Sequence, residues 1–126
     1  MKKSYIYSLL FVFALVINAC TYDFIAEEEL PPIDPNVDVL FSTQIIPIFT
    51  DKCVACHKPG GEAPDLTAAN AYNSIKSMNM ANTATPATSV IYTFPNYQAP
   101  THTWKQYSAA EAQLVLTWIQ QGAKNN

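Results

Sequence analysis

The strongest constraint on this chain is a five-residue motif, Cys53-Val54-Ala55-Cys56-His57, which places two thiols and one imidazole within a single short turn. Cysteines at this spacing can form a disulfide, act as a thioredoxin-like redox pair or supply half of a zinc site. The sequence lacks the βαβ pattern that surrounds a thioredoxin-like pair, and only His102 follows the motif as a further candidate zinc ligand. These three chemistries therefore receive little support from the rest of the chain.

A fourth chemistry uses both cysteines and the adjacent histidine together. Two thiols at this spacing can reach the two vinyl groups of a porphyrin, and the next residue is then positioned to bind the iron on one face. The motif therefore predicts one covalently bound haem c, with thioether bonds at Cys53 and Cys56 and with His57 as the proximal iron ligand. A small domain buries only a marginal apolar core, and the porphyrin would add an apolar centre to it.

The first 40 residues are expected to lie outside the folded domain. Lys2 and Lys3 precede an uncharged apolar run over residues 6–17, which is shorter than the roughly 20 residues of a membrane span. Residues 17–20 resemble a bacterial lipobox, so we predict a lipoprotein signal peptide over residues 1–19 and lipidation of Cys20. An uncleaved membrane anchor and an ordinary signal peptide are the alternatives.

The segment that follows Cys20 is acidic and rich in proline, which favours an extended chain over a packed element. We predict a lipidated tether over residues 20–40 and a folded domain over residues 41–126. The lipid anchor implies an outer membrane lipoprotein, and the acidic residues loosely resemble surface-export signals, so the domain would face the periplasm or the cell surface. Removal of Lys2 and Lys3 with the signal peptide changes the net charge from −3 to −5, which makes nucleic acid an unlikely kind of partner.

The folded part shows helical periodicity and no alternation typical of strands. We expect a regular helix from about Pro47 to Cys53, with the proline in its first turn, and a second short helix after Thr67. A further turn can begin at Pro86, and residues 94–107 are expected to form a long loop.

The clearest helix is the last one. Ser108 and Glu111 have the spacing of a capping box, and Gly122 provides a stop signal. Apolar residues between these limits share one helical stripe, which must cover an apolar partner; they are Ala110, Leu114, Val115, Trp118 and Ile119.

The chain resembles the small class I cytochromes c, in particular the cytochrome c domains of Bacteroidetes and Planctomycetes lipoproteins. The resemblance covers about residues 41–125 and depends on four segments in order, which are Ile46–Phe49 with the haem motif after it, Ala63–Thr67, Ser89–Tyr92 and Trp118–Ala123. It implies an all-α, cytochrome c-like domain of three to four short helices with long loops around one haem.

The resemblance also implies roles for individual residues. The first and last helices would cross near the haem edge, through Phe49 or Ile45 against Trp118 and Leu114. Pro64 and Leu66 would contact the cofactor. In the family, a proline at the position of Pro64 offers its carbonyl to the second ring nitrogen of the proximal histidine, which fixes the tautomer of the ring.

The distal iron ligand is where the sequence departs from the family pattern. Small cytochromes usually place a methionine several residues before the final helix, but here that position holds His102, and no methionine follows Met80. We therefore predict His102 as the distal ligand, with Met78, Met80 or an open, water-bound iron as alternatives. The aromatic residues of this region are expected to wall the distal side, and they are Tyr92, Phe94, Tyr97, Trp104 and Tyr107.

These features together predict a one-electron carrier rather than an enzyme. Its partners would be redox proteins of unknown identity, reached while the lipid anchor holds the domain to a membrane. The alternative is a haem enzyme or a gas or redox sensor with an open distal site, such as a peroxidase-like protein. The ligation of the iron separates these two interpretations.

Overall fold

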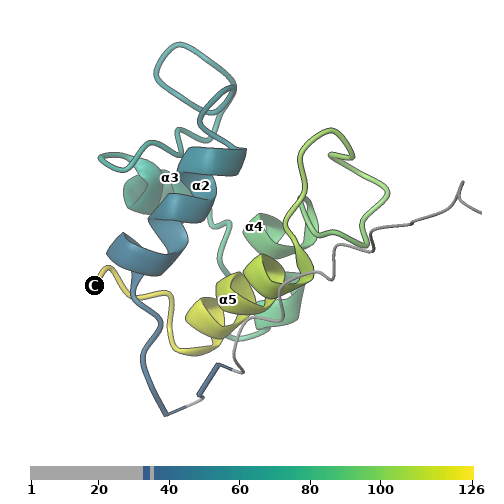
Figure 1. The fold of residues 1–126 in the computed structure, drawn as a ribbon. Coiled ribbons are helices and arrows are strands. Elements are labelled where there is room, and N and C mark those ends of the chain that lie inside the picture. The colour runs from purple at the N-terminus through teal and green to yellow at the C-terminus, as the bar shows by residue number, and fades with distance from the viewer. Residues whose placement is uncertain (1–32, 35) are drawn as a thin grey trace, which may run out of the picture.

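The computed structural model of the chain describes residues 33–34 and 36–126, so the predicted signal peptide, Cys20 and most of the tether lie outside the described residues. This part of the chain contains helices and no strand, which confirms the predicted all-α fold class (Figure 1). None of its helices is long and apolar enough to cross a membrane. In chain order the elements are the π-helical turn η1 (Phe41–Ile45), α2 (Ile46–Lys52), α3 (Ala71–Ser77), the 3-10 turn η2 (Pro86–Thr88), α4 (Val90–Thr93) and α5 (Ala109–Gln120).

The helix α2 forms where the sequence predicts it. Pro47 lies in the first turn, where its missing N–H group would have no partner in the helix. The backbone N–H of Cys53 donates to the carbonyl of Phe49 at 2.8 Å, so the first cysteine caps the carboxyl end of the helix. The helix α2 therefore delivers the cysteine motif directly from its last turn.

The capping box at the start of α5 is confirmed in full. The Ser108 hydroxyl accepts a hydrogen bond from the Glu111 backbone N–H at 3.2 Å, and the Glu111 carboxylate accepts one from the Ser108 N–H at 2.7 Å. Gly122 follows the helix with a φ of 98°, a left-handed conformation that glycine adopts without steric cost. The local signals at both ends therefore set the length of α5.

Two short helices differ from the prediction. α3 begins at Ala71 rather than directly after Thr67, because the Asp65 carboxylate holds residues 65–70 in a turn through bonds to Thr67 and Asn70. α4 was not predicted from the sequence as a helix, and it is only four residues long.

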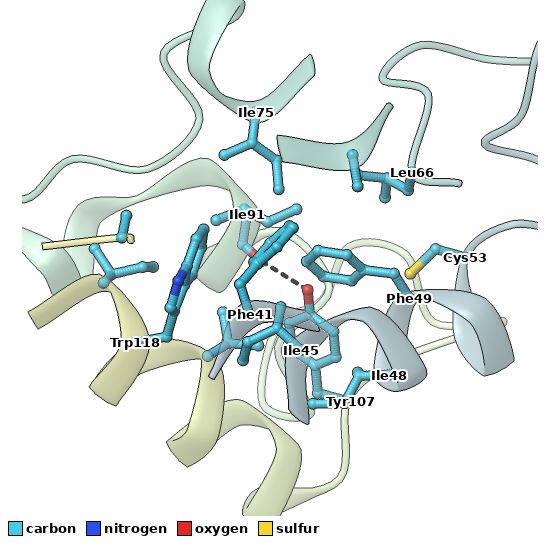
Figure 2. Close-up of a cluster of buried hydrophobic side chains, with 14 of the residues drawn as sticks. Phe41, Ile45, Ile48, Phe49, Cys53, Leu66, Ile75, Ile91, Tyr107 and Trp118 are labelled. Atoms are coloured by element: carbon cyan, nitrogen blue, oxygen red, sulfur yellow. Dashed lines mark hydrogen bonds between the residues drawn. The ribbon is translucent and has the colours of Figure 1, made fainter. Parts of the chain in front are cut away.

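The core forms around Phe41, which contacts aromatic side chains of three other segments. Its ring centroid lies 5.1 Å from that of Trp118 in α5, 5.5 Å from that of Tyr72 in α3 and 6.4 Å from that of Phe49 in α2. Figure 2 shows Phe41 beside Trp118, with Ile45 and Phe49 next to it. The start of the first helical segment therefore meets the last helix through η1, where the Phe41 ring lies against Trp118 and Ile45 is fully buried in the same cluster.

The residues just before Phe41 pack against the folded domain, within the segment that we predict as the tether. Val39 is buried at 3% exposure, and its N–H donates to the Gln121 side chain at 2.7 Å. The N–H groups of Phe41 and Ser42 donate to the side chain and the backbone carbonyl of Asn126, each at 2.9 Å. These contacts hold the C-terminus against the start of the domain, near η1 in Figure 1.

Candidate functional site

The cysteine motif forms a tight turn at the end of α2. The N–H groups of Cys56 and His57 donate to the Cys53 carbonyl at 3.1 and 2.9 Å, and the Glu62 N–H donates to the Cys56 carbonyl at 3.0 Å. A side chain at Gly61 would collide with that same Cys56 carbonyl, so only glycine permits this close return of the backbone. Cys53 is buried in this turn and Cys56 is exposed.

The chemistry of the two thiols argues against the three other uses of the motif. Both cysteines are free rather than joined in a disulfide. Burial raises the pKa of the Cys53 thiol to about 11, whereas redox-active cysteines have lowered pKa values. In the part of the chain that the structure describes, no three His, Cys, Asp or Glu side chains are grouped to hold a metal ion, so zinc lacks a ligand set there.

A cavity of about 240 Å³ opens beside the motif, and its wall is mostly apolar. Of the predicted cofactor contacts, Cys53, His57, Pro64 and Leu66 line it, whereas Cys56 does not. Figure 2 shows the Cys53 sulfur at the edge of the buried cluster, on the side where Leu66 lies. The remaining lining residues are Ala63, Met78, Met80, Val90, Ile91, Phe94, Pro95, His102 and Tyr107.

The ring of His57 is oriented by a backbone carbonyl. Its Nδ1 atom lies 3.2 Å from the carbonyl oxygen of Glu62. A carbonyl can only accept, so Nδ1 carries the proton and the lone pair is left on Nε2, the form that binds a metal. We expected this carbonyl to come from Pro64; the return of the chain after Gly61 places Glu62 beside the ring instead.

His102 lines the same cavity as His57 and lies close to it. The two ring centroids are 6.1 Å apart, and the ring planes differ by 26°. The Nδ1 atom of His102 lies 2.7 Å from the Lys105 carbonyl oxygen, which fixes its tautomer in the same way. Two residues 45 positions apart in the sequence are thus brought to one cavity with equivalent ring protonation.

The aromatic residues around the cavity divide into two groups. Phe94 and Tyr107 line the cavity as expected. Tyr92, Tyr97 and Trp104 do not, which corrects the prediction that all five wall the distal side. Trp104 is 74% exposed and instead packs against the outer part of His102, with ring centroids 4.6 Å apart.

The chain's own residues fit a haem at this site. Covalent attachment, iron binding and porphyrin burial require two thiols, an imidazole with an available Nε2 and an apolar wall; Cys53 and His57 line the apolar cavity, and the exposed Cys56 lies in the same turn. The fold and the site therefore define a small all-α domain built for one covalently attached haem.

Comparison with known proteins gives the family. Residues 47–123, more than half of the chain, match the family model described as Cytochrome c. The chain belongs to the cytochrome c family as a class I c-type cytochrome, and its cofactor is one covalent haem c. Comparisons with curated proteins and with solved structures gave no match.

Proposed function

We propose that this protein is a membrane-anchored one-electron carrier, with its haem bound by Cys53, Cys56 and His57 and its lipid attached to Cys20. Membership of the cytochrome c family indicates electron transfer by haem. The observation that carries the proposal is the apolar cavity at the end of α2, which contains one buried thiol and one imidazole of fixed tautomer.

The haem, when bound, supplies an iron centre that accepts and releases one electron. The chain's residues supply three other functions. His57 donates its Nδ1 proton to the Glu62 carbonyl, which keeps Nε2 available and increases its basicity as a ligand. Leu66, Ile91 and Tyr107 are each buried at 2–3% exposure and keep water from the inner wall of the cavity. The turn held by Gly61 fixes the position of His57 relative to Cys53.

The attachment of haem is tested by expression in a host that matures c-type cytochromes. We expect the reduced protein, treated with alkaline pyridine, to show the spectrum of haem held by two thioethers, and the haem to stay on the chain in a denaturing gel. Cys56→Ser should retain haem through a single thioether, with a shifted pyridine spectrum. A colourless wild-type protein with two titratable thiols would refute the proposal.

The membrane anchor is supported by the lipobox-like segment and by the charge pattern before it. Residues 21–36 would span at most roughly 55 Å when fully extended, so the start of the folded domain would stay within that distance of the membrane. We expect Cys20→Ser to move the holoprotein from the membrane fraction to the soluble fraction. The control is Ser42→Ala, an exposed change within the domain, which should leave it in the membrane fraction. Retention of Cys20→Ser in the membrane fraction would contradict lipidation while leaving the haem site unaffected.

A further inference from the structure

We propose that His102 is the second axial ligand of the haem iron, and that residues 99–107 form a loop whose internal hydrogen bonds present it. This inference rests on the proposed haem site and deepens it, because it assigns the iron position opposite His57. The family match does not assign this position, and the methionine that small cytochromes usually supply before the last helix is missing from the sequence.

The separation of the two imidazoles carries the proposal. A bond between a metal and an imidazole nitrogen is about 2 Å long, so two imidazoles on opposite sides of one ion have ring centroids about 6 Å apart. The centroids of His57 and His102 lie 6.1 Å apart. The measured separation is therefore the one that an iron ion bound between the two rings would set.

The protonation of the rings agrees with the distance. His57 donates from Nδ1 to the Glu62 carbonyl and His102 donates from Nδ1 to the Lys105 carbonyl, at 3.2 and 2.7 Å. Each ring therefore keeps an unprotonated Nε2 atom, and both residues line the same cavity. Metal-bound histidines usually show this pattern, in which the second ring nitrogen donates to a carbonyl or a carboxylate.

The loop that carries His102 is closed by its own hydrogen bonds. The Gln106 side chain donates to the carbonyls of Ala99 and Thr101 at 2.7 and 3.1 Å, and the Lys105 N–H donates to the His102 carbonyl at 3.1 Å. His102 has a φ of 57°, a left-handed conformation that is uncommon outside glycine and is found where the surroundings enforce it, often at functional sites. Gln106 is thus a positioning residue for His102.

Met78 and Met80 are the competing ligands, since both line the same cavity. Met80 is half-buried and packs against the core cluster, which accounts for its position without a metal. Met78 is 50% exposed. A hydrogen bond orients the His102 ring, whereas no hydrogen bond among the described residues orients the side chain of Met78 or Met80.

The test compares spectra of holoproteins that differ at His102. We choose His102→Gly because glycine adopts the left-handed backbone without strain, so the loop should keep its shape. Wild-type ferrous protein should bind carbon monoxide slowly and show a low-spin spectrum without the sulfur-to-iron charge-transfer band of methionine ligation. His102→Gly should become high-spin, bind carbon monoxide at least tenfold faster and return to low spin when imidazole is added.

One control variant and two tests of the competing ligands make the result specific. Thr103→Ala changes an exposed neighbour in the same loop, and it should leave the spectrum unchanged. Met78→Leu and Met80→Leu conserve volume and should also remain low-spin. A low-spin His102→Gly protein, or a Met78→Leu or Met80→Leu protein that becomes high-spin, would overturn the proposal. In every one of these outcomes the haem stays covalently attached, whereas failure of the haem site itself would give colourless wild-type protein.

A second variant tests the positioning role of Gln106. We expect Gln106→Ala to remain folded and low-spin but to bind carbon monoxide about tenfold faster, because the loop opens more often when two hydrogen bonds are lost. Gln106→Glu cannot donate to the two carbonyls and should behave like the alanine variant. Carbon monoxide binding at the wild-type rate in both variants would show that Gln106 does not hold the ligand loop.

Discussion

The buried hydroxyl of Tyr107 joins the site to the core. It donates to the Ile91 carbonyl at 3.0 Å, as Figure 2 shows, and the tyrosine is only 2% exposed. Residue 95, four positions after Ile91, is a proline without an N–H group, so the helix cannot supply another donor to that carbonyl. Burial raises the pKa of Tyr107 well above 10, so the hydroxyl stays protonated as a donor at any ordinary pH.

Tyr107→Phe should destabilise the holoprotein by about 1–3 kcal/mol, because it leaves the buried Ile91 carbonyl unpaired while it preserves the ring packing. Chemical denaturation followed by fluorescence or circular dichroism measures this difference. Tyr92→Phe is the matched control, since the Tyr92 hydroxyl makes no hydrogen bond within the described residues, and it should change stability little. Equal stability of the two variants would contradict the structural role of the Tyr107 hydroxyl.

The Asp65 carboxylate makes the stability of the domain depend on pH. A hydrogen bond from the Thr67 hydroxyl, at 2.6 Å, is the main cause that lowers the pKa of Asp65 below its ordinary value of 3.8. A carboxylate with a lowered pKa in the folded state stabilises that state above pH 3.8, and the contribution is lost as the pH falls through the lowered pKa. The turn before α3 is therefore weakest in acid.

Asp65→Asn should lower the melting temperature at neutral pH, and the difference from the wild type should vanish once the pH falls below the lowered pKa. Thermal unfolding across a pH series checks this. Asp51→Asn removes an exposed carboxylate from α2 and is the control, which should change the melting temperature little at neutral pH. Identical pH profiles for Asp65→Asn and the wild type would show that the carboxylate has no such role.

At the scale of single residues, the sequence predicts some site residues well and others not at all. Cys53 and His57 are recognisable because their side-chain chemistry and spacing are specific, and the structure places both at one cavity. The groups that orient the imidazoles are backbone carbonyls of Glu62 and Lys105. Every residue has a carbonyl, so no residue type marks one as the partner, and only the path of the chain selects it.

Among the helices, α5 is the one most determined by local sequence. Ser108→Ala should cost about 1 kcal/mol, because it leaves an N–H group of the first turn without its acceptor. For a domain of about this size the melting temperature should fall by roughly 4–8 °C. The control is Ser77→Ala at the C-terminal end of α3. The Ser77 side chain caps no N–H group, so this change should have little effect on stability.

Glu111 of the capping box also forms an ion pair with α2. Glu111 lies 3.3 Å from Lys52, so the first turn of α5 is tied to the last turn of α2 beside the cysteine motif. Since the pair is partly exposed, we expect it to add only about 0–1 kcal/mol. An effect of Ser108→Ala indistinguishable from that of Ser77→Ala would mean that packing alone fixes the start of α5.

The other helices show why sequence patterns become unreliable for short elements. α3 and α4 have seven and four residues, too few for a helix to be stable on its own or for a periodic pattern to be clear. α4 is held by tertiary contacts such as the Tyr107 hydroxyl bond to Ile91, which joins segments 16 residues apart. Helices fixed by such distant contacts cannot be located from their own residues.

At the scale of the whole molecule, the two ends of the domain close on each other. The Gln121 side chain accepts from the Val39 N–H and donates to the Val37 carbonyl, while Lys124 pairs with Asp38 at 2.7 Å. The composition of residues 20–40 predicts an extended tether and gives no sign that residues 37–39 bond to the residues that follow α5. The contact depends on residues more than 80 positions away, so no local pattern contains it.

The haem should be a structural part of the core as well as its redox centre. The cavity beside Cys53 and His57 has a mostly apolar wall, and a porphyrin bound there would remove that apolar surface from water. We therefore expect the packing of the domain to depend on the haem.

The variant Cys53→Ala/Cys56→Ala, which cannot bind haem covalently, should therefore lose cooperative unfolding and near-ultraviolet circular dichroism while it keeps much of its helical signal. It should also bind an apolar dye that the holoprotein excludes. Cys56→Ser, which keeps one thioether and the porphyrin, is the control and should unfold cooperatively. If the double variant unfolded as cooperatively and at the same denaturant concentration as the holoprotein, the helices and the Phe41 cluster alone would be sufficient to hold the fold.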